Sequence, residues 1–118
     1  MIESILTSIK KLLGIAEEYT NFDSDIVMYI NSAFLDLKQL GVGPIDGFGI
    51  EDDGAVWTDF IDDQTDPGKR TLLSSAKTFI YLKTKLAFDP PIGQAVLKSY
   101  QDMLAEIEWR LNVEVETK

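Results

Sequence analysis

The sequence contains neither cysteine nor histidine, and these two absences exclude several kinds of protein chemistry. Without cysteine the chain forms no disulfide, holds no zinc through thiolates and offers no thiol nucleophile. Without histidine it lacks the usual general base near neutral pH and the commonest metal ligand. A Ser-His-Asp or Cys-His catalytic centre therefore cannot be built within these 118 residues.

Long apolar runs and positive charge are also scarce. The longest uninterrupted apolar runs span a few residues, far short of the ~20 that a membrane-spanning helix requires. The N-terminal segment has an early acid, Glu3, and a late lysine pair, so we do not expect a signal peptide. The formal net charge of −9 argues against a basic surface that binds the phosphate backbone of nucleic acid.

The negative charge is concentrated in one segment of the chain. Residues 41–66 hold eight acidic residues and no lysine or arginine, whereas the remainder holds twelve acidic and eleven basic residues. An EF-hand needs acids at alternate positions, a central glycine and a glutamate in twelfth place. No frame within EDDGAVWTDFIDDQTDPG (51–68) provides this spacing, so we interpret the segment as a solvated acidic surface rather than a metal site.

Apolar residues with helical spacing predict four helices, at about residues 2–13, 24–40, 67–87 and 92–111. Gly14 and Gly41 suit the left-handed ends of the first two helices. Asp23 and Asp66 are predicted N-caps, and the prolines of DPP (89–91) end the third helix. With 45% hydrophobic residues the chain can build a core, and we predict an all-α small bundle in a single domain over residues 1–118.

Two segments do not fit the helical pattern. The connection over residues 41–66 contains many apolar residues, so we expect it to form a short β-hairpin or a helical turn near residues 57–61. The tail, residues 112–118, alternates apolar and charged residues as an extended strand would. Such a tail either adds to a sheet edge of a neighbouring protein or remains a frayed terminus.

Several residues allow two interpretations each. Lys10 and Lys11 lie opposite the apolar stripe of the first helix. This stripe either packs in the core or lies on a membrane, and we interpret it as part of the core. Trp57 and Phe60 either hold the loop onto the bundle or contact another protein. Trp109, beside Arg110, is either half-buried at a helix end or part of a subunit interface. We find no catalytic motif: the S-x-x-K spacing of Ser74 and Lys77 lacks the elements that accompany it in acyl enzymes.

Five segments in a fixed order resemble a known family. They are LTSIKKLLGI (6–15), FDSDIVMYINSAFLDLKQLGVGP (22–44), WTDFI (57–61), FDPP (88–91) and EIEWRLNV (106–113). The FDPP break, followed by a helix that ends in EWRLN, is the most specific part. Together these segments resemble the small head–tail connector proteins of long-tailed phages and prophages of Gram-positive bacteria, which are also called head-completion or adaptor proteins.

The resemblance implies a mostly α-helical virion protein that has no enzymatic activity and no cofactor. Its subunits would assemble as a ring below the portal and extend the DNA channel toward the tail. The implied partners are the portal protein, neighbouring connector subunits and a tail-side adaptor or stopper protein. The location would be the head–tail junction, after assembly in the host cytoplasm. DNA would pass through the channel without sequence-specific binding, and no membrane would be involved.

Two sets of residues are candidates for contacts in such a particle. The candidates for partner contacts are Trp57, Phe60, Trp109, Arg110, Val113 and Val115. The candidates for an acidic surface that faces the DNA channel or the portal are Asp52, Asp53, Asp59, Asp62 and Asp63. A negative channel wall would repel phosphates and let DNA slide, whereas a basic portal surface would attract the acids. The sequence also allows an acidic binding protein that mimics nucleic acid and occupies a basic partner.

Overall fold

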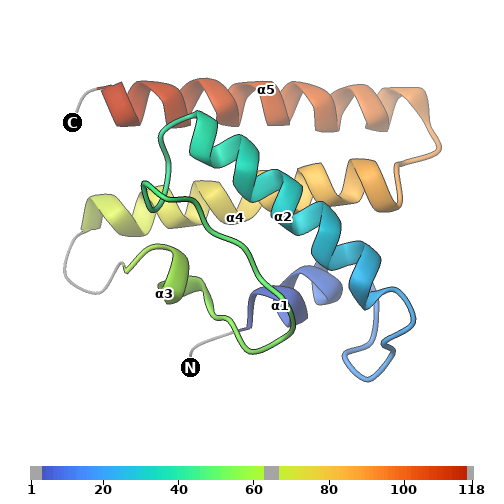
Figure 1. The fold of residues 1–118 in the computed structure, drawn as a ribbon. Coiled ribbons are helices and arrows are strands. Elements are labelled where there is room, and N and C mark those ends of the chain that lie inside the picture. The colour runs from blue at the N-terminus through green and yellow to red at the C-terminus, as the bar shows by residue number, and fades with distance from the viewer. Residues whose placement is uncertain (1–3, 63–66, 117–118) are drawn as a thin grey trace.

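A computed structural model describes residues 4–62 and 67–116, with side chains as far as residue 113. These residues form five helices (Figure 1), which are α1 (Ile5–Leu12), α2 (Asp23–Gln39), α3 (Trp57–Phe60), α4 (Pro67–Phe88) and α5 (Gln94–Glu116). The predicted all-α class is confirmed. In the part of the chain described, strand pairing is limited to an isolated antiparallel bridge between Ser4 and Val56. No β-hairpin forms there, and the helical turn expected near residues 57–61 is α3.

Helix α1 is short and has a capping residue at each end. Ser4 precedes it and its hydroxyl oxygen accepts a hydrogen bond from the Thr7 N–H at 3.2 Å. At the other end Gly14 adopts φ +81°, and the Ile15 N–H donates to the Lys10 carbonyl at 2.9 Å. This pair of features is a Schellman ending, which satisfies carbonyls that the last turn leaves unpaired. The predicted end of the helix at Gly14 is confirmed.

Helix α2 ends in the same way but begins differently from the prediction. Gly41 has φ +84°, and the N–H of the buried Val42 donates to the Leu37 carbonyl at 2.9 Å. At the start, however, Phe22 occupies the N-cap position and Asp23 is already the first helical residue. The predicted N-cap role of Asp23 is therefore wrong. Its carboxylate lies 2.9 Å from the ammonium group of Lys10 instead.

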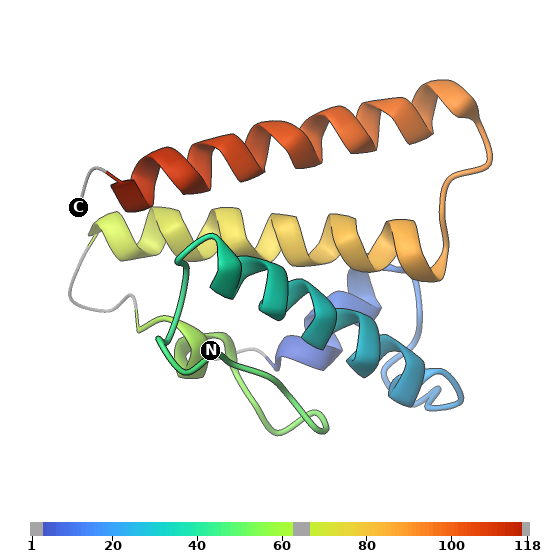
Figure 2. The ribbon, with the colours of Figure 1, turned by 45° about the horizontal axis from the view of Figure 1, so that its top comes forward.

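Helices α4 and α5 form a long antiparallel pair (Figure 2). Pro67 is the first residue of α4, and the helix ends at Phe88, directly before the DPP sequence, as predicted. The Asp66 cap lies outside the described residues. Helix α5 continues to Glu116, so the extended conformation predicted for the tail is wrong for residues 112–116. Each of these residues joins an existing helix without a new nucleation step, whereas a strand would need a partner.

Helix α4 is central in the core, because it packs against both α2 and α5 (Figures 1 and 2). Its buried apolar residues are Leu73, Ala76, Phe79, Ile80 and Leu82. Helix α2 buries Ile26, Ile30, Ala33, Phe34 and Leu37. Helix α5 is different: among its described side chains, Ile107 and Leu111 are the buried ones. Val96 and Met103 belong to the apolar face predicted for this helix, yet they are 49% and 43% exposed.

Candidate functional site

The connection between α2 and α3 is fixed to the helices by side-chain hydrogen bonds. The Asn31 amide of α2 accepts from the Ile50 N–H at 2.7 Å and donates to the Ile50 carbonyl at 2.9 Å. At the other end of the connection, the Trp57 indole N–H donates to the Ser8 hydroxyl at 2.9 Å, and that hydroxyl donates to the Ile5 carbonyl. Because buried polar groups need such partners, these bonds define one conformation for the connection.

Aromatic packing attaches the same connection to the core. The Phe34 ring of α2 has its centroid 5.0 Å from that of Phe48, 4.7 Å from that of Phe60 and 6.5 Å from that of Trp57. Trp57 is 4% exposed and Phe60 is 5% exposed. Both residues therefore hold the loop onto the bundle, which was one of the two interpretations from the sequence. In this conformation they offer almost no surface to another protein.

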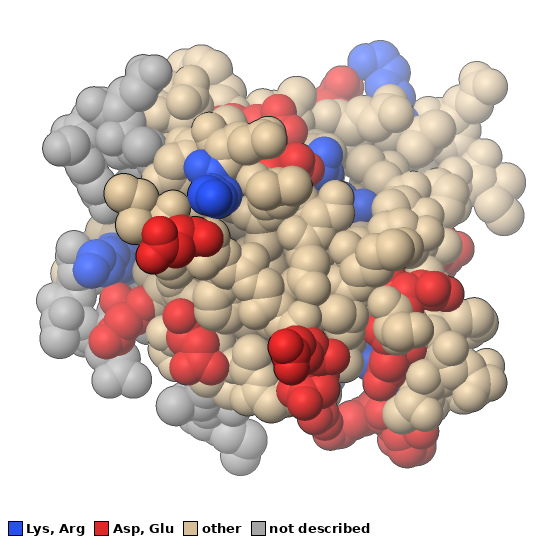
Figure 3. All heavy atoms as spheres, in the orientation of Figure 1, with Lys and Arg blue, Asp and Glu red and all other residues tan. Residues whose placement is uncertain are grey.

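The acidic candidates lie on the surface. Asp52, Asp53, Asp59 and Asp62 are exposed, and Asp63 lies outside the described residues. Two of them also accept hydrogen bonds from backbone N–H groups. The Asp52 carboxylate accepts from the Gly54 N–H at 2.8 Å. The Asp59 carboxylate accepts from the Val56 N–H at 2.9 Å, which fixes the start of α3. Figure 3 shows acidic side chains along the lower part of one face, with few basic side chains among them.

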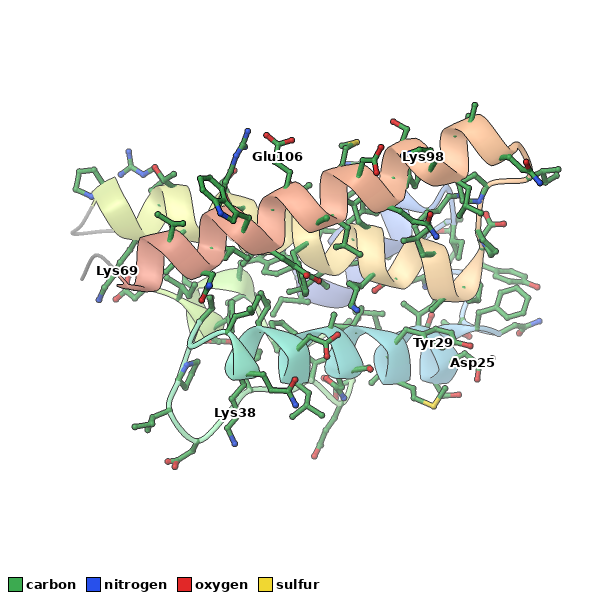
Figure 4. All side chains as sticks on the ribbon, turned by 90° about the horizontal axis from the view of Figure 1, so that it is seen from above. Asp25, Tyr29, Lys38, Lys69, Lys98 and Glu106 are labelled. Carbon is green, nitrogen blue, oxygen red and sulfur yellow. The ribbon has the colours of Figure 1, made fainter. Side chains whose placement is uncertain are left out.

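Helix α5 carries the exposed partner candidates. Trp109 is 67% exposed, which does not fit half-buried packing and favours a surface that another protein covers. Arg110 pairs with Glu106 at 2.6 Å, and both side chains are about 60% exposed. Val113 is 37% exposed, and the side chain of Val115 lies outside the described part. In Figure 4 the Glu106 side chain points away from α2.

Lys10 has a role that the sequence did not indicate. Its place opposite the apolar stripe predicts an exposed side chain, yet the residue is 2% exposed. The ammonium group donates to the carbonyls of Glu17 and Tyr19 at 2.9 and 2.8 Å and lies 2.9 Å from the Asp23 carboxylate. Lys10 therefore fixes the connection between α1 and α2. Helical spacing alone does not carry a signal for this role, because the partners are mostly backbone carbonyls.

Sequence reasoning also missed several apolar residues at the surface. The most exposed are Ile45 at 91% and Ile92 at 103%, followed by Leu12, Met28 and Leu35 at 55–58%. Ile45 does have a signal, since GVGPIDG (41–47) brackets it with glycines and a proline that favour a turn. Ile45 is thus an apolar side chain that a turn displays at the surface.

Two findings in the described part of the chain bear on metal and acid–base chemistry. None of its acidic side chains form a group of three or more that could hold a metal ion. A hydrogen bond to the Asp89 carboxylate raises the pKa of Lys85, and burial raises the pKa of Tyr81. Both shifts keep these groups in their ordinary protonated state at neutral pH. Neither group therefore offers a base for proton transfer.

One further property concerns membranes. None of the helices within residues 4–62 and 67–116 combines the length and the apolar character that crossing a bilayer demands.

These features define a small helical protein whose loop is folded into its own core and whose last helix is covered on one side. Trp109 of that helix is 67% exposed, and tryptophan is enriched in protein–protein interfaces relative to the rest of the surface.

The family model described as phage connector protein matches residues 5–118, and the chain belongs to this family. The resemblance noted in the sequence is thereby confirmed. This is a family of structural proteins rather than enzymes, and membership implies contacts with other virion proteins. No curated protein and no solved structure matches the chain at a significant level.

Proposed function

We propose that this chain is a head–tail connector subunit that assembles as a ring below the portal and extends the DNA channel toward the tail. The family match over residues 5–118 supports the connector role. The observation that carries the assembly is the uncovered side of α5, where Trp109 is 67% exposed in the single chain. Large aromatic residues contribute much of the binding energy where they become buried between proteins.

The exposed acids supply a second surface in this proposal. Ring assembly repeats the charges of Asp52, Asp53, Asp59 and Asp62 in every subunit. If this surface lines the channel, it repels DNA phosphates and keeps the wall from retaining DNA during exit. If it faces the portal, it binds basic side chains there. The chain acts without a cofactor in either arrangement, and its other partner is a tail-side adaptor or stopper protein.

The main experiment uses DNA-filled, portal-bearing heads that lack this protein. We expect the purified chain to sediment with these heads, to add ring-shaped density below the portal in electron microscopy and to improve retention of packaged DNA. If the chain ignored the heads but bound and inhibited a DNA-binding enzyme in a salt-sensitive way, the connector role would be wrong. That outcome would instead support the nucleic-acid mimic.

A charge variant distinguishes the two orientations of the acidic surface. We propose Asp52→Asn with Asp53→Asn, since asparagine at position 52 can still accept the hydrogen bond from the Gly54 N–H. Glu17→Gln with Glu18→Gln is the control, because it removes the same charge from exposed residues elsewhere. If the acids face the portal, the first variant binds heads more weakly and with less salt dependence. If they face the channel, head binding is unchanged and DNA exit becomes slower.

A further inference from the structure

Ile45 is displayed at the surface by a fixed turn. The Gly47 N–H donates to the Pro44 carbonyl at 2.9 Å, and Gly43 and Gly47 have φ of +92° and +90°. The turn is held on both sides, because Val42 is buried before it and Phe48 packs on the core after it. A side chain that is 91% exposed on an ordered backbone loses little conformational entropy when a partner covers it. Ile45 therefore has the properties of an apolar contact residue.

A groove of about 300 Å³ lies between the start of α4 and the end of α5. Its lining includes Thr71, Leu72, Ser75, Trp109, Arg110 and Val113. The indole of Trp109 and the aliphatic side chains of Leu72 and Val113 suit a branched aliphatic side chain. Three of the residues that were candidates for partner contacts, Trp109, Arg110 and Val113, thus line one concave site.

The turn and the groove both border Leu72, but they open in separate hollows of the surface. The Lys38 side chain packs against Gly47, so Lys38 marks the side that displays the turn. Glu106 pairs with Arg110 of the groove and marks the groove. Figure 4 shows Lys38 and Glu106 pointing in opposite directions from the two sides of the molecule. Because Ile45 is 91% exposed, it does not occupy the groove of its own chain and is available to the groove of a second copy.

The charges beside the two features are complementary. Asp46 follows Ile45 and is exposed, whereas the groove is lined by Arg110. Lys38, on the side of the turn, is exposed and faces solvent, while Glu106 lies on the side of the groove. When the turn enters the groove of another chain, Asp46 and the neighbouring Lys38 of α2 approach the ion pair that Arg110 forms with Glu106. Such complementarity fixes the orientation of two partners.

We propose that subunits of this protein join head to tail, with Ile45 of one chain inserted into the α4–α5 groove of the next. This inference deepens the proposed connector function and rests on it. The two contact surfaces differ, so an open row of subunits has a free turn at one end and a free groove at the other until the ring closes. The occupant of the groove is thus a second copy of this chain.

The absence of cysteine from the sequence allows a direct test by disulfide formation. A chain with Ile45→Cys and Ser75→Cys carries one thiol on the turn and one in the groove. Upon oxidation, both alone at high concentration and on portal-bearing heads, we expect a ladder of covalent dimers, trimers and larger species. The single variants should give no species beyond dimers. A chain with Ile92→Cys and Ser75→Cys is the matched control, because Ile92 is even more exposed.

A charge substitution gives an independent test. Ile45→Asp should raise the apparent dissociation constant of assembly at least about tenfold, since an aspartate loses the burial of the apolar side chain. Ile92→Asp should leave assembly unchanged. Circular dichroism and thermal unfolding should be the same for both variants and the parent chain, because both isoleucines are exposed.

The outcomes separate this inference from the function on which it rests. If rings form on heads but the ladder appears only with the Ile92 pair, or Ile45→Asp assembles normally, the turn-in-groove contact is wrong and the connector function stands. If neither the parent chain nor any variant binds heads, the connector function itself is wrong. Ladder formation with the Ile45 pair, together with loss of assembly in Ile45→Asp, supports both.

Discussion

The acidic connection is irregular but well buried, whereas helix α5 is regular but largely exposed. The connection, residues 41–62, contains one short helix, yet it buries Val42, Ile50, Trp57, Phe60 and Ile61 in the core. Helix α5 is regular over 23 residues, yet the buried residues among its described side chains are Ile107 and Leu111. The irregular segment is thus fixed by tertiary contacts, and the regular one is left with a free side.

This difference separates residues that stabilise the fold from residues available to partners. Aromatic residues in the connection contribute to the stability of the single chain because they are removed from water on folding. Trp109 contributes little to it because it stays exposed. The same residue type therefore has a structural role in one region and a candidate binding role in the other. Substitutions in the two regions should therefore differ in their effect on the free energy of unfolding.

The largest effect is expected from Phe60→Ala in the connection. Phe60 is 5% exposed and packs on Phe34 and Phe48, so its truncation should lower the free energy of unfolding by about 3–4 kcal/mol. Trp109→Ala should change it by less than about 0.5 kcal/mol. Urea denaturation of both variants measures the two values. Equal losses would show that α5 is as well covered as the connection.

Lys10→Met should produce the next largest effect. The change leaves the Asp23 carboxylate and two backbone carbonyls without their buried ammonium partner. We expect a loss of about 2–3 kcal/mol in the free energy of unfolding. Lys11→Met is the control, because Lys11 is exposed and its loss should cost less than about 0.5 kcal/mol. A small effect at position 10 would mean that water replaces the ammonium group there.

A pair of glycine variants tests how closely the connection packs. At Gly43, φ is +92° and an added Cβ would lie 2.4 Å from Cε1 of Phe60. At Gly14, φ is +81° and nothing lies within 4 Å of an added Cβ. Gly14→Ala should therefore cost about 1 kcal/mol and Gly43→Ala about 2–3 kcal/mol, measured by thermal and urea unfolding. Similar costs would indicate that the Phe60 ring moves aside easily.

Among the substitutions at buried contacts, Ser8→Ala is expected to have the smallest effect. The variant removes the acceptor of the Trp57 indole N–H, which is buried and bonded at 2.9 Å. An unsatisfied buried donor of this kind should cost about 1–2 kcal/mol of the free energy of unfolding. Ser32→Ala, at an exposed position of α2, should be nearly neutral in the same urea titration. If Ser8→Ala were neutral as well, the hydrogen bond would not help to hold the connection.

The helices could be predicted from the sequence because their signals are local. Apolar spacing locates α2 and α4. Gly14 marks the end of α1, Gly41 marks the end of α2, and the DPP sequence marks the end of α4. The Asp23 error shows the limit of this reasoning, since a carboxylate near a helix start can cap the helix or pair with a distant cation. Asp23 pairs with Lys10 because the tertiary structure brings the two side chains together. The extension of α5 to Glu116 likewise depends on the helix that precedes it.

The candidate surfaces were predictable only in part, because exposure is set by the packing of distant elements. The exposed acids follow from composition. The sequence does not say that Trp57 is covered while Trp109 is not, since both lie among charged residues. The difference arises because Trp57 contacts Ser8 and Phe34, whereas Trp109 lies at the edge of the α4–α5 groove and stays 67% exposed.

The link between α1 and the connection has a consequence for the order of folding. Helix α1 has eight residues, too few to be stable alone in water, and the Ser8 partner Trp57 lies 49 residues further along the chain. The Ile5 N–H likewise needs the Ala55 carbonyl, at 3.0 Å. During synthesis the first helix therefore leaves the ribosome long before its partners. We expect its amides to gain protection in pulsed hydrogen exchange only after those of α2 and α4.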